Sequence, residues 1–170
     1  MKHLILLALL VVISVFFFSS CNNNKAERMQ NEIDSLKTEM EDSYKPGLGE
    51  FMLTEQMHHS KLWFAGINEN WDLANFELGE IKETFDNAVK FLPERKETKG
   101  IPMIYPALDS LQTSINKQDI KKFTKDFKVL TETCNECHQA VHFQFNVIKT
   151  PSSEPVSNQE FKPRKIKGGE

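Results

Sequence analysis

Apolar residues beyond residue 47 recur at intervals of three and four, which is the repeat of an α-helix with one buried face. A first helix is predicted over residues 49–67, where the inward stripe reads Met52, Gln56, His59 and Trp63. His58 lies one position round from this stripe and is expected to face outward or sideways. A second helix is predicted from an N-cap at Asn70 to a stop at Pro93. Its inward positions are Trp71, Ala74, Leu78, Ile81, Phe85, Ala88 and Leu92.

Two more helices are predicted after the polar loop ERKETKGIP. The third begins near Pro106, because proline is favoured in a first turn, and its apolar positions are Leu108, Leu111 and Ile115. The fourth begins near Asp119 and ends before Pro151. Its stripe reads Ile120, Phe123, Phe127, Leu130, Cys134, Cys137, Val141 and Phe145. Four such helices with short connections predict an all-α fold, an antiparallel four-helix bundle over residues 48–148.

The start of the chain has the pattern of a targeting segment. Residues 1–20 combine Lys2 and an apolar run with two final serines, which is typical of a secretory signal. Cys21 follows at once, as in a bacterial lipoprotein, where this cysteine carries the lipid. An ordinary signal peptide or a short uncleaved anchor is the alternative. Residues 21–47 are predicted to form a polar, partly helical stalk, with a stripe at Met29, Ile33, Leu36 and Met40.

The end of the chain shows no helical repeat. Residues 149–170 are therefore predicted to be an extended tail, and Phe161 is a candidate to dock on the domain.

Composition and charge exclude several function classes. The formal net charge of −3 gives no electrostatic case for binding nucleic acid. The chain has no Gly-rich phosphate loop and no arguable Ser-His-Asp arrangement, so we do not expect an enzyme. Glu77, Glu80 and Glu83 are expected to form a solvated face, because they fall largely outside the apolar stripe and no Glu-x-x-His motif occurs with the partners that a di-iron bundle needs.

The five residues Cys134-Asn135-Glu136-Cys137-His138 carry the most specific signal. Two thiols three apart lie on one face of a helix. They can bond the two vinyl groups of one haem c, and His138 can then reach the iron as the proximal ligand. Lipidation of Cys21 would leave Cys134 and Cys137 as a pair among the three cysteines.

Three other readings of this cluster are weaker. A thioredoxin-like redox pair would lie at a helix N-terminus rather than within a helix. A zinc site made of Cys134, Cys137, His138 and His142 would need one helix to surround a tetrahedral ion. A disulfide between Cys134 and Cys137 would distort a regular helix.

An exported four-helix bundle with one Cys-x-x-Cys-His near the end of its last helix resembles the class II c-type cytochromes, the cytochrome c-prime group. The segments KLWFAGINENWDLANFELGEI, CNECHQ and PVSNQEF also resemble an uncharacterised group of bacterial haem lipoproteins. The resemblance implies a single-haem protein that transfers one electron to or from a redox partner at the membrane surface. With the lipid anchor, it implies the periplasmic side of a bacterial envelope, and it makes a homodimer a candidate assembly.

The side of the iron opposite His138 decides between functions. We expect His138 to lie about nine residues before the end of the fourth helix, which matches a level near residue 58 in an antiparallel first helix. His59 is therefore the first candidate ligand, and Met52 is the second, as some class II cytochromes carry methionine there. An open or water-occupied position is the third outcome. It would favour a five-coordinate protein that binds nitric oxide or carbon monoxide. A lipoprotein without haem that only supports a partner is a further alternative.

Overall fold

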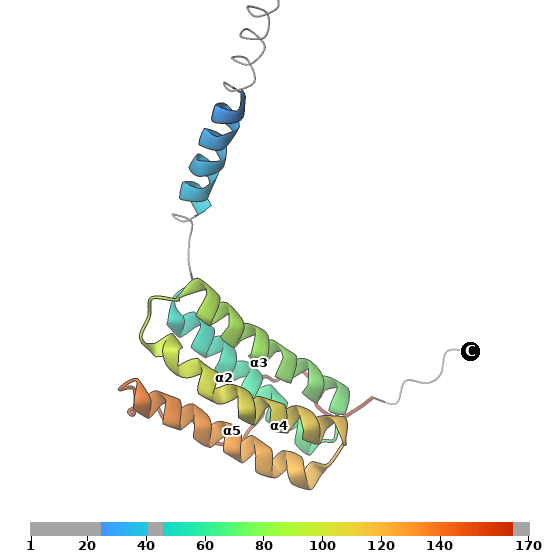
Figure 1. The fold of residues 1–170 in the computed structure, drawn as a ribbon. Helices are drawn as coiled ribbons and strands as arrows, with labels where there is room; N and C mark the ends of the chain where they lie inside the picture. Colours follow the sequence, from blue (N-terminus) through green and yellow to red (C-terminus); the bar gives the residue numbers. More distant parts are fainter. Residues whose placement is uncertain (1–24, 41–45, 165–170) are drawn as a thin grey trace, which may run out of the picture. The chain divides into compact units, whose positions relative to one another are not determined.

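The computed structural model describes residues 25–40 and 46–164, and these residues form helices and no strand. Residues 25–40 are a helix in one compact unit, and Pro46 begins a second unit. The second unit contains α2 (Leu48–Ile67), α3 (Trp71–Phe91), the 3-10 helix η1 (Glu97–Ile104), α4 (Tyr105–Asn116) and α5 (Ile120–Ala140). Figure 1 shows α2 to α5 lying side by side, as in a helical bundle. The predicted all-α class is confirmed for the described residues.

The helix starts follow the capping signals in the sequence. Asn70 precedes α3, and its side-chain oxygen accepts a hydrogen bond from the Leu73 amide at 3.4 Å. Asp119 precedes α5 and accepts one from the Lys122 amide at 3.0 Å. Pro106 is in the first turn of α4, where its missing N–H costs nothing. These three predicted starts are confirmed.

The core confirms the predicted stripes of α3 and α4 but corrects the phase of α2. On α2 the buried residues are Glu55, His59, Leu62, Ala65 and Gly66, whereas Gln56 is exposed. The buried face is therefore rotated by about one position from the predicted one. A charged residue, Glu55, occupies a position that the hydrophobic pattern assigned to the outside.

A second buried carboxylate corrects another prediction. Glu77 on α3 is fully buried, and its Oε2 atom lies 2.6 Å from Nδ1 of the half-buried His58. His58 thus faces α3, and Glu77 is part of the interior rather than of a solvated face. Glu83 is exposed, as expected, and Glu80 is half-buried.

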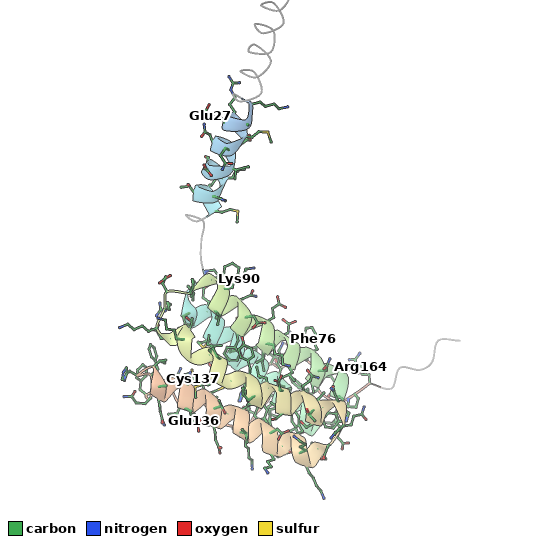
Figure 2. All side chains as sticks on the ribbon, in the orientation of Figure 1. Glu27, Phe76, Lys90, Glu136, Cys137 and Arg164 are labelled. Atoms are coloured by element: carbon green, nitrogen blue, oxygen red, sulfur yellow. The ribbon has the colours of Figure 1, made fainter. Side chains whose placement is uncertain are left out.

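The last helix is shorter than its apolar stripe. We predicted a helix that ends before Pro151, but α5 ends at Ala140. Val141 and Phe145 therefore lie outside the helix, and Phe145 is 78% exposed. The predicted polar loop before α4 also contains structure, because η1 buries Ile101 and Ile104. Figure 2 shows Cys137 on α5 beside its exposed neighbour Glu136.

The tail docks on the domain through Phe161, as predicted. Residues 149–164 contain no helix or strand, yet Phe161 is only 1% exposed. Its ring centroid lies 5.7 Å from that of Phe64 on α2. The Asn70 side chain donates a hydrogen bond to the Phe161 carbonyl at 3.1 Å. The same asparagine therefore caps α3 and holds the tail.

Several predictions concern residues outside the described part of the chain. The signal segment (1–20) and Cys21 lie there, as does part of the stalk. In the stalk, residues 25–40 are helical and their stripe, Met29, Ile33, Leu36 and Met40, is exposed. Within the described ranges, no helix combines the length and apolar character of a membrane-spanning segment.

Gly66 is expected to be intolerant of any side chain. A Cβ atom there would lie 2.0 Å from Cζ of Phe123 on α5, whereas a Cβ at the exposed Gly79 of α3 would meet nothing within 4 Å. Gly66→Ala should lower the free energy of unfolding by roughly 1–3 kcal/mol through overpacking. Gly79→Ala should raise it by about 1 kcal/mol through helix propensity. Urea denaturation followed by circular dichroism measures both, and equal effects would contradict the close approach.

Candidate functional site

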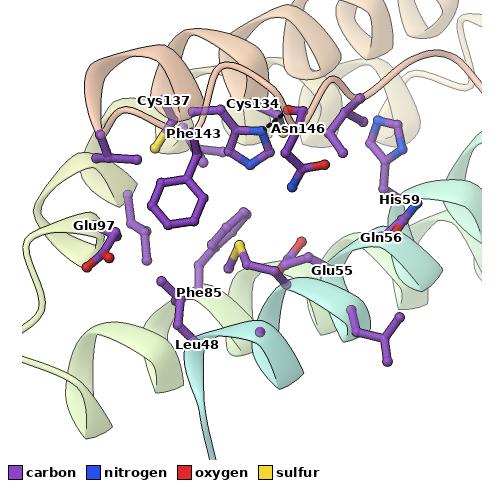
Figure 3. A pocket seen from close by; sticks show the side chains of 18 of the residues that line it. Leu48, Glu55, Gln56, His59, Phe85, Glu97, Cys134, Cys137, Phe143 and Asn146 are labelled. Atoms are coloured by element: carbon purple, nitrogen blue, oxygen red, sulfur yellow. Dashed lines mark hydrogen bonds between the residues drawn. The ribbon is translucent and has the colours of Figure 1, made fainter.

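The residues of the Cys-x-x-Cys-His motif lie at a cavity of about 400 Å³. Its walls come from α2, α3, η1, α5 and the segment that follows α5, and most of the lining is apolar. This volume falls within the usual range for a small-molecule or cofactor site. Figure 3 shows Cys134 and Cys137 on one side of the cavity, with Leu48, Glu55 and Phe85 across from them.

Cys134 and Cys137 face the cavity one turn apart on α5, and both are free thiols. η1 packs closely against the second thiol, because a Cβ atom at Gly100 would lie 2.9 Å from Sγ of Cys137. Burial, and then the nearby Glu55 and Cys137, raise the pKa of Cys134 to about 12. Burial also raises the pKa of Cys137. A catalytic redox pair needs a lowered thiol pKa, so these surroundings argue against that reading.

His138 presents one ring nitrogen for coordination. It lies in the last turn of α5, and its Nδ1 atom is 2.6 Å from the backbone oxygen of Asn146. A carbonyl oxygen only accepts, so Nδ1 carries the hydrogen, and Nε2 is the nitrogen that holds the lone pair in the neutral ring. Metal-bound histidines commonly donate their other N–H in this way, which fixes the tautomer and the ring orientation.

The residues after α5 turn back to supply that carbonyl. His142 has a φ of 66°, in the left-handed region, which ends the helix. The Phe143 amide then donates to the His138 carbonyl at 2.7 Å. Asn135 anchors the returning segment at Ile148, because it donates to the Ile148 carbonyl at 2.9 Å and accepts from the Ile148 amide at 2.8 Å. Asn135, to which the sequence analysis gave no role, therefore helps to position His138 of the same motif.

His59 lines the cavity but is already engaged. It is 5% exposed, and its Nε2 atom lies 2.9 Å from the hydroxyl oxygen of Thr131. That hydroxyl donates to the Phe127 carbonyl at 2.9 Å, so it accepts a hydrogen bond from Nε2–H of His59. Burial lowers the pKa of His59 to about 4, which keeps the ring neutral. Its Nε2 atom therefore has a partner within the core.

Met52, rather than His59, lies level with His138. Gly66 approaches Phe123 and His59 contacts Thr131, so positions along α2 fall as positions along α5 rise. His138 is seven residues beyond Thr131, and Met52 is seven residues before His59, about two helical turns in each case. The prediction of a level near residue 58 assumed a longer fourth helix, whereas α5 ends at Ala140 and His138 lies in its last turn.

Glu55 is a site residue that the sequence reasoning missed. It is 8% exposed, lines the cavity, and its Oε1 atom has no hydrogen-bond partner in the described part of the chain. Burial raises the pKa of this carboxyl well above its ordinary value. Glu55 precedes His59 by four residues, which places both side chains on the same face of the helix. This spacing was the signal in the sequence that could have identified Glu55 as a site residue.

The zinc alternative finds no support in the arrangement. Within residues 25–40 and 46–164, no three His, Cys, Asp or Glu side chains come together as a metal-binding group. His142 is exposed and has left the helix.

Comparisons with protein-family models, curated proteins and solved structures find no match to the chain.

The hydrogen bond between His59 and Thr131 is expected to stabilise the domain. Thr131→Val removes the acceptor and leaves the buried His59 N–H without a partner, which should cost about 1–3 kcal/mol. Thr133→Val is a matched control, because the Thr133 hydroxyl donates to the Val129 carbonyl of its own helix. Thermal or urea unfolding measures the difference. A Thr131→Val variant as stable as Thr133→Val would show that the bond contributes nothing.

Proposed function

We propose that this protein is a single-haem c-type cytochrome that transfers one electron at a time. One observation carries the proposal: two thiols and one free imidazole nitrogen lie at the wall of a single apolar cavity of cofactor size. In this proposal the helices form an antiparallel four-helix bundle of the class II cytochrome type. The protein is anchored through a lipid on Cys21 at the periplasmic side of a bacterial envelope.

The side chains fit the covalently bound group. Cys134 and Cys137 are reduced, one turn apart, and face the same cavity, which are the requirements for two thioether bonds to the edge of a haem. His138 is oriented by Asn146 so that Nε2 can bind the iron. When bound, the haem supplies an iron that accepts and releases one electron. The apolar walls exclude water and hold the group in a medium of low dielectric constant.

Met52 is the favoured side chain for the opposite face of the iron. It lines the cavity at the level of His138, and its thioether needs no hydrogen bond to be given up. His59 would have to break its bond with Thr131. If both His138 and Met52 held the iron, the pair would suit electron transfer, because coordination would then change little between oxidation states. The binding of nitric oxide or carbon monoxide is the alternative function, and it requires that neither side chain coordinates.

The interaction partners stay predictions from the sequence. An exported cytochrome requires a redox partner protein, and we expect it to dock where the electron enters or leaves. A homodimer through helix packing also stays a prediction.

Covalent attachment is the first expected outcome. Protein produced in cells that mature c-type cytochromes should carry the mass of one porphyrin on the polypeptide, and denaturing electrophoresis should not remove it. Cys134→Ala and Cys137→Ala should each keep the porphyrin mass through the one remaining thioether, and the double variant should lose covalent haem. Intact-protein mass spectrometry measures all three. A wild-type polypeptide without added mass would rule out the proposed function.

The visible spectrum should distinguish the far-side candidates. We expect a low-spin, six-coordinate spectrum in the wild type, and Met52→Ala should convert it to a high-spin form that binds carbon monoxide. His59→Ala should keep the low-spin spectrum and lose stability instead. A spectrum that changes only in His59→Ala would assign the ligand to His59. A high-spin wild type would favour gas binding.

A further inference from the structure

Glu55 combines a buried position with an unsatisfied carboxyl group. It projects from α2 into the cavity, across from the α5 wall that carries the two thiols (Figure 3). Its exposed fraction is 8%, and Oε1 lacks a hydrogen-bond partner within the described residues. A buried carboxylate without a partner costs several kcal/mol, so proteins rarely keep one without a role.

The groups that face Glu55 do not include an available cation. Arg95 also lines the cavity, but its guanidinium is held by Glu97 at 3.0 and 3.3 Å. On α2, His59 is neutral and bonded to Thr131. The Tyr105 hydroxyl at the start of α4 donates to Asp86 of α3.

The α5 wall offers no cation that pairs with Glu55 either. It contributes two thiols of raised pKa and the His138 ring, whose Nδ1–H is given to Asn146. Glu55 nevertheless interacts electrostatically with groups around it. Its negative charge contributes to raising the pKa of Cys134 and the pKa of Tyr105. A change in the protonation of Glu55 therefore changes the electrostatic potential at the opposite wall of the cavity.

We propose that Glu55 is a redox-linked proton site: its carboxylate takes up one proton from solvent when one electron reaches the haem, and the carboxylic acid releases that proton when the electron leaves. The inference rests on the proposed function. The electron comes from the one-electron donor protein that the proposed function requires. One proton and one negative charge enter together, so the net charge of the cavity does not change.

Electrostatics in an apolar cavity gives the physical reason. An electron added without a proton would leave one more uncompensated negative charge inside walls of low dielectric constant. That charge attracts a proton to a nearby group able to bind one, and Glu55 is the cavity-lining carboxyl that has an unpartnered buried oxygen within the described residues. The coupling is reciprocal, so protonated Glu55 must in turn favour the reduced state.

The test is the midpoint potential of the haem-loaded protein as a function of pH, measured by optical redox titration between about pH 5 and about pH 9. The wild-type potential should fall by up to about 59 mV per pH unit across one window, the value for one proton per electron. Glu55→Gln should remove this slope. Glu55→Asp should keep it in a shifted window, and Glu83→Gln, which changes an exposed carboxylate on α3, should leave it unchanged.

In this titration, a wild-type potential independent of pH would overturn the inference, and so would a slope that persists in Glu55→Gln. Redox-difference infrared spectroscopy of the wild type gives a second readout that needs no variant. A protonated-carboxyl band should appear on reduction, and its absence would also overturn the inference. Protein without covalent porphyrin would overturn the proposed function as well, whereas a loaded protein with a flat potential would overturn only the role of Glu55.

Discussion

The geometry of the site depends on the pair of hydrogen bonds between Asn135 and the backbone of Ile148. These bonds hold the segment after α5 against the helix that it has just left. The Asn146 carbonyl then meets the His138 ring, which fixes the side from which Nε2 is available. The local order Cys-Asn-Glu-Cys-His therefore does two things at once: it spaces the thiols, and it supplies the side chain that ties down the segment orienting the histidine.

The contact between α2 and α5 differs from one end of the domain to the other. Near Gly66 the backbone of α2 approaches the Phe123 ring of α5, and the rings of Trp63, Phe123 and Phe127 fill the interior. Toward Met52 and His138 a cavity takes the place of this aromatic packing. A packed end and a hollow end would suit the proposed function, because the packed end keeps the cavity walls apart whether or not a haem is bound.

The all-α class, the four α-helices of the domain and three of their starts could be predicted from the sequence, because they rest on local signals: three-four spacing, Asn70 and Asp119 as caps, and Pro106 in a first turn. The 3-10 helix η1 was not predicted. The phase of α2 could not be predicted either, because the pattern rule sends an acid such as Glu55 outward. Glu77 was misplaced for the same reason, since its partner His58 is nineteen residues away. The end of α5 was missed because apolar residues continue past Ala140, and the left-handed turn at His142 gives no hydrophobic signal. Local spacing was therefore enough to identify the two thiols and the imidazole as candidate site residues. The other residues of the cavity are brought together by long-range contacts, which the spacing does not show.

The docked tail has a consequence for the order in which the domain is completed. Ile148 is held by Asn135 of α5 and Phe161 by Asn70 between α2 and α3, and thirteen residues lead from the first of these points to the second. Extended chain can span about 45 Å over that length, against about 30 Å for the 20 residues of α2. The segment between Ile148 and Phe161 is therefore held to the helices at both of its ends. During synthesis this segment can dock at both points only after residue 161 has been made, by which time every helix of the described residues has already been synthesised.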